Sequence, residues 1–224
     1  IVWTSLIGVV LASLSLGYYL GGKLADKKPK YEILSLVILC SAIYICLTAF
    51  LKDPVLILVR SWALDLRLSA ILASIFLLSL PSVLLGMVSP YAIRLKVRSV
   101  NKSGNVAGGL YAISTLGSIF GTFLAGFFLI AYFGHTMLLV GIALVLVVAS
   151  LVVFSKDYKF RLFVFLFVIG CFWASPQVTR SIRGIDFIDV DTQYNRVFIY
   201  NSNEPKGQRP IKVMVFDPKF TQAA

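Results

Sequence analysis

The charged residues best suited to specific chemistry lie in one short stretch, 21–30, which reads G-G-K-L-A-D-K-K-P-K. A single carboxylate, Asp26, stands there among lysines at the end of a long apolar run. A carboxylate beside a helix end can pair with a basic residue of a neighbouring helix and hold the two ends together. Asp26 could equally act as a local cap in a solvated basic turn, and the sequence leaves both interpretations open.

The other candidate groups form no catalytic or metal-binding pattern. The cysteines Cys40, Cys46 and Cys171 lie in apolar stretches without CxxC spacing, so neither a disulfide framework nor a zinc site is predicted. His135 stands alone in a tight turn with no second ligand at metal-binding spacing, and we predict no metal or catalytic role for it. Asp65, with arginines on both sides, is interpreted as an interfacial charge cluster.

The composition places these residues in a membrane protein. Of the 224 residues, 58% are apolar and only 14% are charged, and the mean hydropathy is +0.88. Soluble domains are about 45–50% apolar and about 25% charged, so a soluble globular or disordered chain is excluded. The formal charge of +11 is assigned to basic loops that set membrane orientation, and no nucleic-acid partner is predicted. Since the sequence begins inside an apolar run without Met or a basic leader, we expect a fragment and no signal peptide.

Apolar runs of about 20 residues predict membrane-spanning helices. Five runs qualify or nearly qualify, and they cover residues of about 1–22, 33–51, 70–93, 106–133 and 137–154. A sixth run, 160–174, is short, and it is either a thin span or a helix lying in the interface. Residues 52–69 are predicted to form a loop. The expected fold class is mostly α, a polytopic transmembrane bundle of five to six spans, located as a multi-pass protein in the plasma or inner membrane.

Basic residues gather in alternate loops. They follow the first, third and fifth spans, whereas the turn 134–136 carries neither Lys nor Arg. Because positive loops stay on the cytoplasmic side, the first span is predicted to run from outside to inside. The tail lies outside if the sixth run crosses, and it is cytoplasmic if that run lies in the interface. The spans hold no charged residue near their centres, which counts against a proton-coupled transporter.

Small residues recur every four positions in the first and fourth spans. In the first span they are Ser13, Gly17 and Gly21. In the fourth span two neighbouring rows include Gly117, Gly121, Ser118, Thr122 and Gly126. Such spacing lets helix backbones approach closely in lipid, so we interpret these rows as helix-packing surfaces. A substrate path lined by small residues is the alternative interpretation.

The composition changes abruptly near the end of the chain and divides it into a transmembrane helical domain, 1–174, and a polar tail, 175–224. In the tail, the patterns over 195–200 and 211–216 predict a β-hairpin, with an earlier short strand around 187–190. Two or three strands cannot bury a core alone. The tail is therefore expected to begin a soluble domain that is incomplete here, or to dock on another surface.

The lysine-rich stretch resembles the loop signature of major facilitator transporters, in which a Gly, three residues, an Asp and a basic residue precede another Gly and further basic residues. Gly22, Asp26, Lys27 and Lys30 fit this signature, whereas Pro29 replaces the second Gly. The resemblance implies that Asp26 helps to hold the inward face of the bundle closed.

Longer stretches resemble the membrane region of bacterial membrane-bound spermidine synthase-like proteins. They cover residues 14–26, 81–95 and 108–129. The tail agrees, because D-T-Q-Y-N at 191–195 resembles the opening E-S-x-Y-Q of the aminopropyltransferase β-domain. The resemblance implies substrate contact by Tyr194 and Asn195, with Asn195 in place of the usual Gln.

The same resemblance implies that the parent protein transfers an aminopropyl group from decarboxylated S-adenosylmethionine, its cosubstrate, to putrescine. That reaction needs a Gly-rich cosubstrate turn and an acidic pair that deprotonates the amine, since only a neutral amine can attack. The tail lacks such a turn, so we expect no catalytic residue and no cofactor in this chain. The expected partners are the lipid bilayer and a polyamine, putrescine or spermidine, with homo-oligomerisation left open. The alternatives are a major-facilitator-like transporter module and a plain membrane anchor.

Overall fold

The computed structural model describes residues 2–62, 65–97, 103–133, 135–154, 164–170, 187–191, 196–202 and 211–215. Within this part of the chain, five helical stretches are long and apolar enough to cross a membrane. They are Val2–Lys27, Tyr31–Lys52, Arg67–Lys96, Ser103–Leu129 and Thr136–Val153. The predicted mostly α bundle with five long apolar helices is therefore confirmed.

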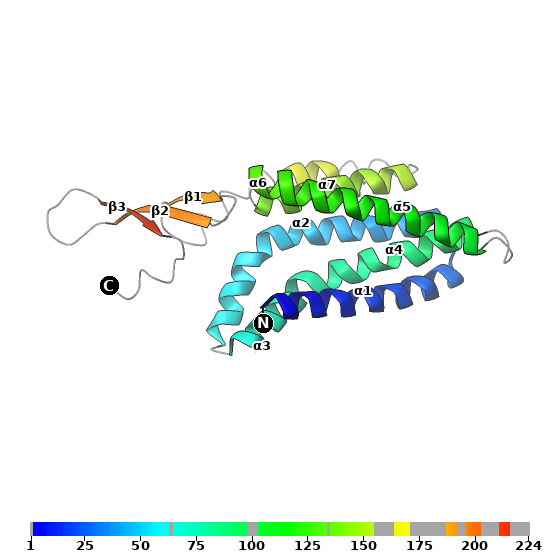
Figure 1. Cartoon of the computed structure of the whole chain (residues 1–224), viewed down its shortest axis with the longest axis horizontal. Coiled ribbons are helices and arrows are strands. Elements are labelled where there is room, and N and C mark those ends of the chain that lie inside the picture. The colour runs from blue at the N-terminus through cyan, green and yellow to red at the C-terminus, as the bar shows by residue number, and fades with distance from the viewer. Residues whose placement is uncertain are drawn as a thin grey trace.

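The long helices lie alongside one another (Figure 1). The helices concerned are α1 (Val2–Lys27), α2 (Tyr31–Ser61), α4 (Leu80–Lys96) and α5 (Ser103–Leu124). α1 and α4 end where α2 and α5 begin, at the right of Figure 1. The described basic residues at the ends of α1 and α4 and in the turn 28–30 therefore share one end of the bundle, called the basic end below.

α2 is longer than the predicted second span. It continues to Ser61, and α3 (Leu66–Ser74) begins shortly afterwards, so the prediction of a loop over 52–69 is wrong for most of that segment. Pro54 lies inside α2, where its ring removes one N–H and crowds the carbonyl four residues earlier. Such a proline bends a helix without ending it. The final part of α2 accordingly turns away from the rest of the helix in Figure 1.

Two helical stretches pass through a π-helical turn without a break. η1 (Ile75–Ser79) joins α3 to α4, and η3 (Ala125–Leu129) joins α5 to the short α6 (Ile130–Tyr132). The third predicted span is thus continuous although it contains Pro81 and Pro90.

Side chains of α2 bond carbonyls of the η1 turn. Pro81 has no N–H for the carbonyl of Leu77, and the Thr48 hydroxyl lies 3.4 Å from that carbonyl while it donates to the Tyr44 carbonyl of its own helix at 2.9 Å. The carbonyl of Phe76 accepts the Tyr44 hydroxyl at 2.9 Å. A helix in lipid has no water to satisfy a freed carbonyl, so neighbouring hydroxyls allow the proline-containing helix to stay intact.

The larger apolar core lies between α2 and α7 (His135–Val153). Its most buried members include Ala42 and Cys46 of α2 and Val140, Ala143 and Val147 of α7. Val164 and Val168 belong to the same cluster, so the helical segment 164–170 of the sixth run packs on these helices. The rest of that run lies outside the described residues, and its crossing of the membrane stays a prediction.

A buried pair of serines also joins α2 to α7. The Ser35 hydroxyl donates to the Ser150 carbonyl at 2.7 Å, and the Ser150 hydroxyl donates to the Ser35 carbonyl at 2.9 Å. Both residues are fully buried. Each hydroxyl thereby finds a partner across the helix contact, which lets the polar groups lie inside an apolar bundle.

Three strands of the tail form an antiparallel sheet in the order β1-β2-β3. They are β1 (Phe187–Asp191), β2 (Arg196–Ser202) and β3 (Ile211–Val215). Val190 lies opposite Val197 in the first pair, and Tyr200 lies opposite Val213 in the second. That the tail begins a larger soluble domain stays a prediction.

Candidate functional site at the basic end

The small residues of α1 pack directly on the backbone of α4. Ser13, Gly17 and Gly21 are all buried, and the two glycines lie against α4. A methyl group on Gly21 would stand 2.6 Å from the Met87 Cα atom, and one on Gly17 would stand 3.0 Å from the Gly86 Cα atom. Glycine at these two positions is therefore what allows the two backbones to approach so closely.

The small residues of α5 have no such neighbour. A methyl group on Gly117 or Gly121 of α5, or on Gly126 of the following η3 turn, would have nothing within 4 Å. Ser118 and Thr122 donate to carbonyls of their own helix, at 3.0 and 2.8 Å. No residue of α5 is buried. The predicted packing surface of the fourth span therefore meets no other helix in the described part of this chain, unlike the row on α1.

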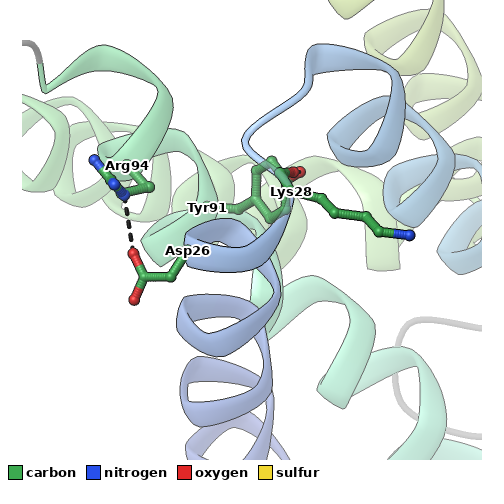
Figure 2. A network of polar contacts seen from close by, with 4 residues as sticks. All are labelled: Asp26, Lys28, Tyr91 and Arg94. Atoms are coloured by element: carbon green, nitrogen blue, oxygen red, sulfur yellow. Dashed lines mark hydrogen bonds and ion pairs between the residues drawn. The ribbon is translucent and has the colours of Figure 1, made fainter.

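Asp26 forms an ion pair with Arg94 at the basic end (Figure 2). The Arg94 Nε atom lies 2.9 Å from the Asp26 Oδ1 atom, and the pair joins the last turns of α1 and α4. The side chains are 49% and 71% exposed for Arg94 and Asp26, so the pair is worth about 0–1 kcal/mol. Of the two interpretations of Asp26, the structure shows the ion pair with a neighbouring helix.

Tyr91 fastens the turn between α1 and α2 to α4. Its side chain is fully buried one helical turn before Arg94. Its hydroxyl donates to the carbonyl of Lys28 and accepts the backbone N–H of Lys30 at 3.2 Å. Sequence reasoning missed Tyr91, because an aromatic residue inside an apolar run gives no sign that its hydroxyl holds a distant backbone turn.

The remaining residues of the predicted loop signature take less part in these contacts. Lys27 and Lys30 have exposed side chains, and Lys30 takes part through its backbone. A methyl group on Gly22 would have nothing within 4 Å, unlike one on the adjacent Gly21. The contact between α1 and α4 thus depends on Gly21, and the ion pair depends on Asp26.

The remaining candidates of the sequence analysis are Tyr194, Asn195 and His135. Tyr194 and Asn195 fall outside the described residues. His135, expected in a tight turn, is the first residue of α7. No group of three His, Cys, Asp or Glu residues that could hold a metal ion is found among the described residues.

Comparison of the chain with protein families, curated proteins and solved structures finds no match. The class of the protein follows from its helices: five are long and apolar enough to span a membrane, as in a multi-pass membrane protein.

Proposed function

We propose that this chain is the membrane region of a spermidine synthase-like protein, in which the helices anchor an aminopropyltransferase at the plasma or inner membrane. The observation that carries the anchoring role is the closed contact between α1 and α4. Gly17 and Gly21 lie against the backbone of α4, so no solute fits between these two helices at that level. The Asp26–Arg94 pair and Tyr91 then join the same helices at the basic end.

The enzymatic part of the proposal depends on the resemblance of 14–26, 81–95, 108–129 and 191–195 to that family. An antiparallel sheet follows the helices in the chain, as a β-domain at the start of an aminopropyltransferase would. In the proposed reaction, an amine nitrogen of putrescine loses its proton to a base and attacks the aminopropyl carbon of decarboxylated S-adenosylmethionine. The C–N bond forms as the C–S bond breaks, and the sulfonium leaves as a neutral thioether.

A second candidate is a major-facilitator-like transporter module for polyamines. The observation that favours it is the Asp26–Arg94 pair, because it links two helix ends on the side predicted to be cytoplasmic. An ion pair in that position can hold an inward face closed and can open when the helices separate. The two candidates differ in whether a polyamine crosses the bilayer.

The test uses the polypeptide encoded by the complete gene, reconstituted in liposomes, with two readouts. One is transfer of a labelled aminopropyl group from decarboxylated S-adenosylmethionine to putrescine, and the other is uptake of labelled putrescine and spermidine. The anchor proposal expects transfer, and it expects uptake no greater than in protein-free liposomes. Absence of transfer to either amine would overturn the enzymatic proposal.

Uptake above the protein-free level would favour the transporter module. Two variants then test whether that uptake depends on the Asp26–Arg94 pair. Asp26→Asn removes the charge that pairs with Arg94, whereas Glu32→Gln removes an exposed charge on the adjacent first turn of α2. A transporter that uses the ion pair should change its uptake rate with Asp26→Asn and keep it with Glu32→Gln. An equal rate in all three proteins would count against the role of the pair in transport.

A further inference from the structure

Exposed cations from three segments gather at the basic end of the bundle. They are Lys23 and Lys27 of α1, Lys28 and Lys30 of the turn, and Arg94 and Lys96 of α4. The acidic residues described on these segments and on the first turn of α2 are Asp26 and Glu32. Asp26 is bound to Arg94, and the lysines form no ion pair among the described residues. The surface therefore has a local excess of positive charge.

The order of apolar, aromatic and basic residues along the end of α1 indicates the membrane depth expected for Lys27 and the turn that follows it. Lys23 is the first charged residue after the apolar part of α1, and its ammonium lies 5.9 Å from the centre of the Tyr19 ring. Exposed tyrosines such as Tyr19 are typical of the membrane–water interface. One helical turn from Lys23 to Lys27 rises about 6 Å. The headgroup zone on each side of the hydrocarbon is roughly 5–7 Å thick, so Lys27 falls within it.

The turn is also held in one conformation before any ligand arrives. Pro29 fixes one backbone angle of the turn, and the buried Tyr91 hydroxyl bonds the backbone of Lys28 and Lys30 on either side of it. In Figure 2 the Lys28 side chain extends away from the Asp26–Arg94 pair. A site that is ordered in advance loses little conformational entropy on binding.

We propose that the segment 27–30, the last residue of α1 and the turn after it, binds the phosphate of an anionic glycerophospholipid from the surrounding leaflet. Lys27, Lys28 and Lys30 supply the charge, and Tyr91 positions the turn that carries two of them. The proposal is independent of whether the helices anchor an enzyme or move a solute. Its physical basis is the attraction of clustered basic residues next to a membrane span for anionic headgroups.

The full chain is reconstituted in nanodiscs of phosphatidylcholine with about 20 mol% phosphatidylglycerol, a composition that supplies the anionic headgroup. Nanodiscs expose both leaflets, so the orientation of the protein does not affect the result. Spin-labelled phosphatidylglycerol and phosphatidylcholine report the preference of the protein for the anionic lipid. We expect this preference to fall about fivefold for each lysine replaced by Gln at positions 27, 28 and 30.

Two controls separate a site from diffuse attraction. A variant with Lys206, Arg209 and Lys219 replaced by Gln loses the same charge in the tail and should keep the preference. Tyr91→Phe keeps every charge but releases the turn, and it should weaken the preference. A preference that follows total charge alone, with equal loss in the tail variant and no loss in Tyr91→Phe, would overturn the proposal. Displacement of the lipid by about 10 mM inorganic phosphate, beyond the effect of NaCl at equal ionic strength, would also overturn it in favour of a free-phosphate site.

Discussion

α1 and α5 carry the same kind of small-residue row, but the two rows have different neighbours. On α1, Gly17 and Gly21 lie against the backbone of α4, with Gly86 opposite Gly17. On α5, Gly117 and Gly121 have open space around them, although their spacing is identical. The spacing makes a close approach possible, and the facing surface of another helix decides whether it occurs.

The residues around the two rows also differ in how exposed they are. Large apolar side chains on α5 and η3 are exposed, among them Phe120 at 69% and Phe127 at 69%, which suits contact with lipid tails. Phe123 stacks on Phe127 of the same helical stretch, with ring centres 5.8 Å apart. α1 instead continues its buried row to Ala25, which is fully buried beside Tyr91. Both stretches are apolar enough to span a membrane, but of these two helices only α1 has a buried face against another described helix.

The largest expected effect comes from filling the glycine contact. Gly21→Ala places a methyl group against the Met87 backbone, which cannot move like a side chain, and should destabilise the folded chain by about 1–3 kcal/mol. The matched variant Gly121→Ala adds its methyl group to open space and should be neutral or slightly stabilising, by up to about 1 kcal/mol. Thermal unfolding in detergent measures both. Equal destabilisation by the two variants would remove the distinction between α1 and α5.

A smaller effect is expected from the tyrosine that holds the turn. Tyr91→Phe removes the hydroxyl that bonds the Lys28 carbonyl and the Lys30 N–H, although these two backbone groups still bond each other at 2.9 Å. The loss should cost about 0.5–1.5 kcal/mol, the net value of an ordinary hydrogen bond. Tyr111→Phe is the control, because Tyr111 is 57% exposed on α5. Trypsin cleavage after Lys30 should become faster in Tyr91→Phe and stay unchanged in the control. An unchanged cleavage rate in Tyr91→Phe would show that other contacts hold the turn.

The smallest effect is expected from the exposed ion pair. Asp26→Asn should lower the free energy of unfolding by no more than about 1 kcal/mol, and the difference should shrink at high salt because exposed charges are screened. A double-mutant cycle with Arg94→Gln measures the coupling between the two side chains. A coupling above about 2 kcal/mol would mean that the pair is less hydrated than its exposure indicates.

The helices were the most predictable part of the molecule, because lipid imposes a length and an apolar composition that can be counted along the chain. The loop over 52–69 was mispredicted for a local reason. The loop was predicted because charged residues interrupt the apolar run. In the structure, Pro54 lies inside α2, and the helix continues beyond it to Ser61. The continuity through Pro81 could not be predicted from the local sequence either, because a carbonyl of the η1 turn before it is bonded by Tyr44 of another helix.

Of the three residues that form the candidate site, only Asp26 could be selected from the sequence. Asp26 could be selected from its isolation among lysines, and an ion pair with a neighbouring helix was one of its two interpretations. Its partner could not be identified, because Arg94 lies 68 residues away and several other basic residues were available. Tyr91 could not be selected at all, since its role is defined by a backbone turn that lies 63 residues away from it at Lys28.

The class of the protein, its long apolar helices and the placing of basic residues in alternate loops could all be predicted from the amino-acid sequence alone. Each of these follows from local composition, because hydrophobic transfer and loop charge act on short segments. Only the tertiary structure decided which row of small residues meets a helix, which arginine pairs with Asp26 and what holds the lysine turn. These contacts join residues far apart in the chain, so they depend on how whole helices pack and on which backbone faces which.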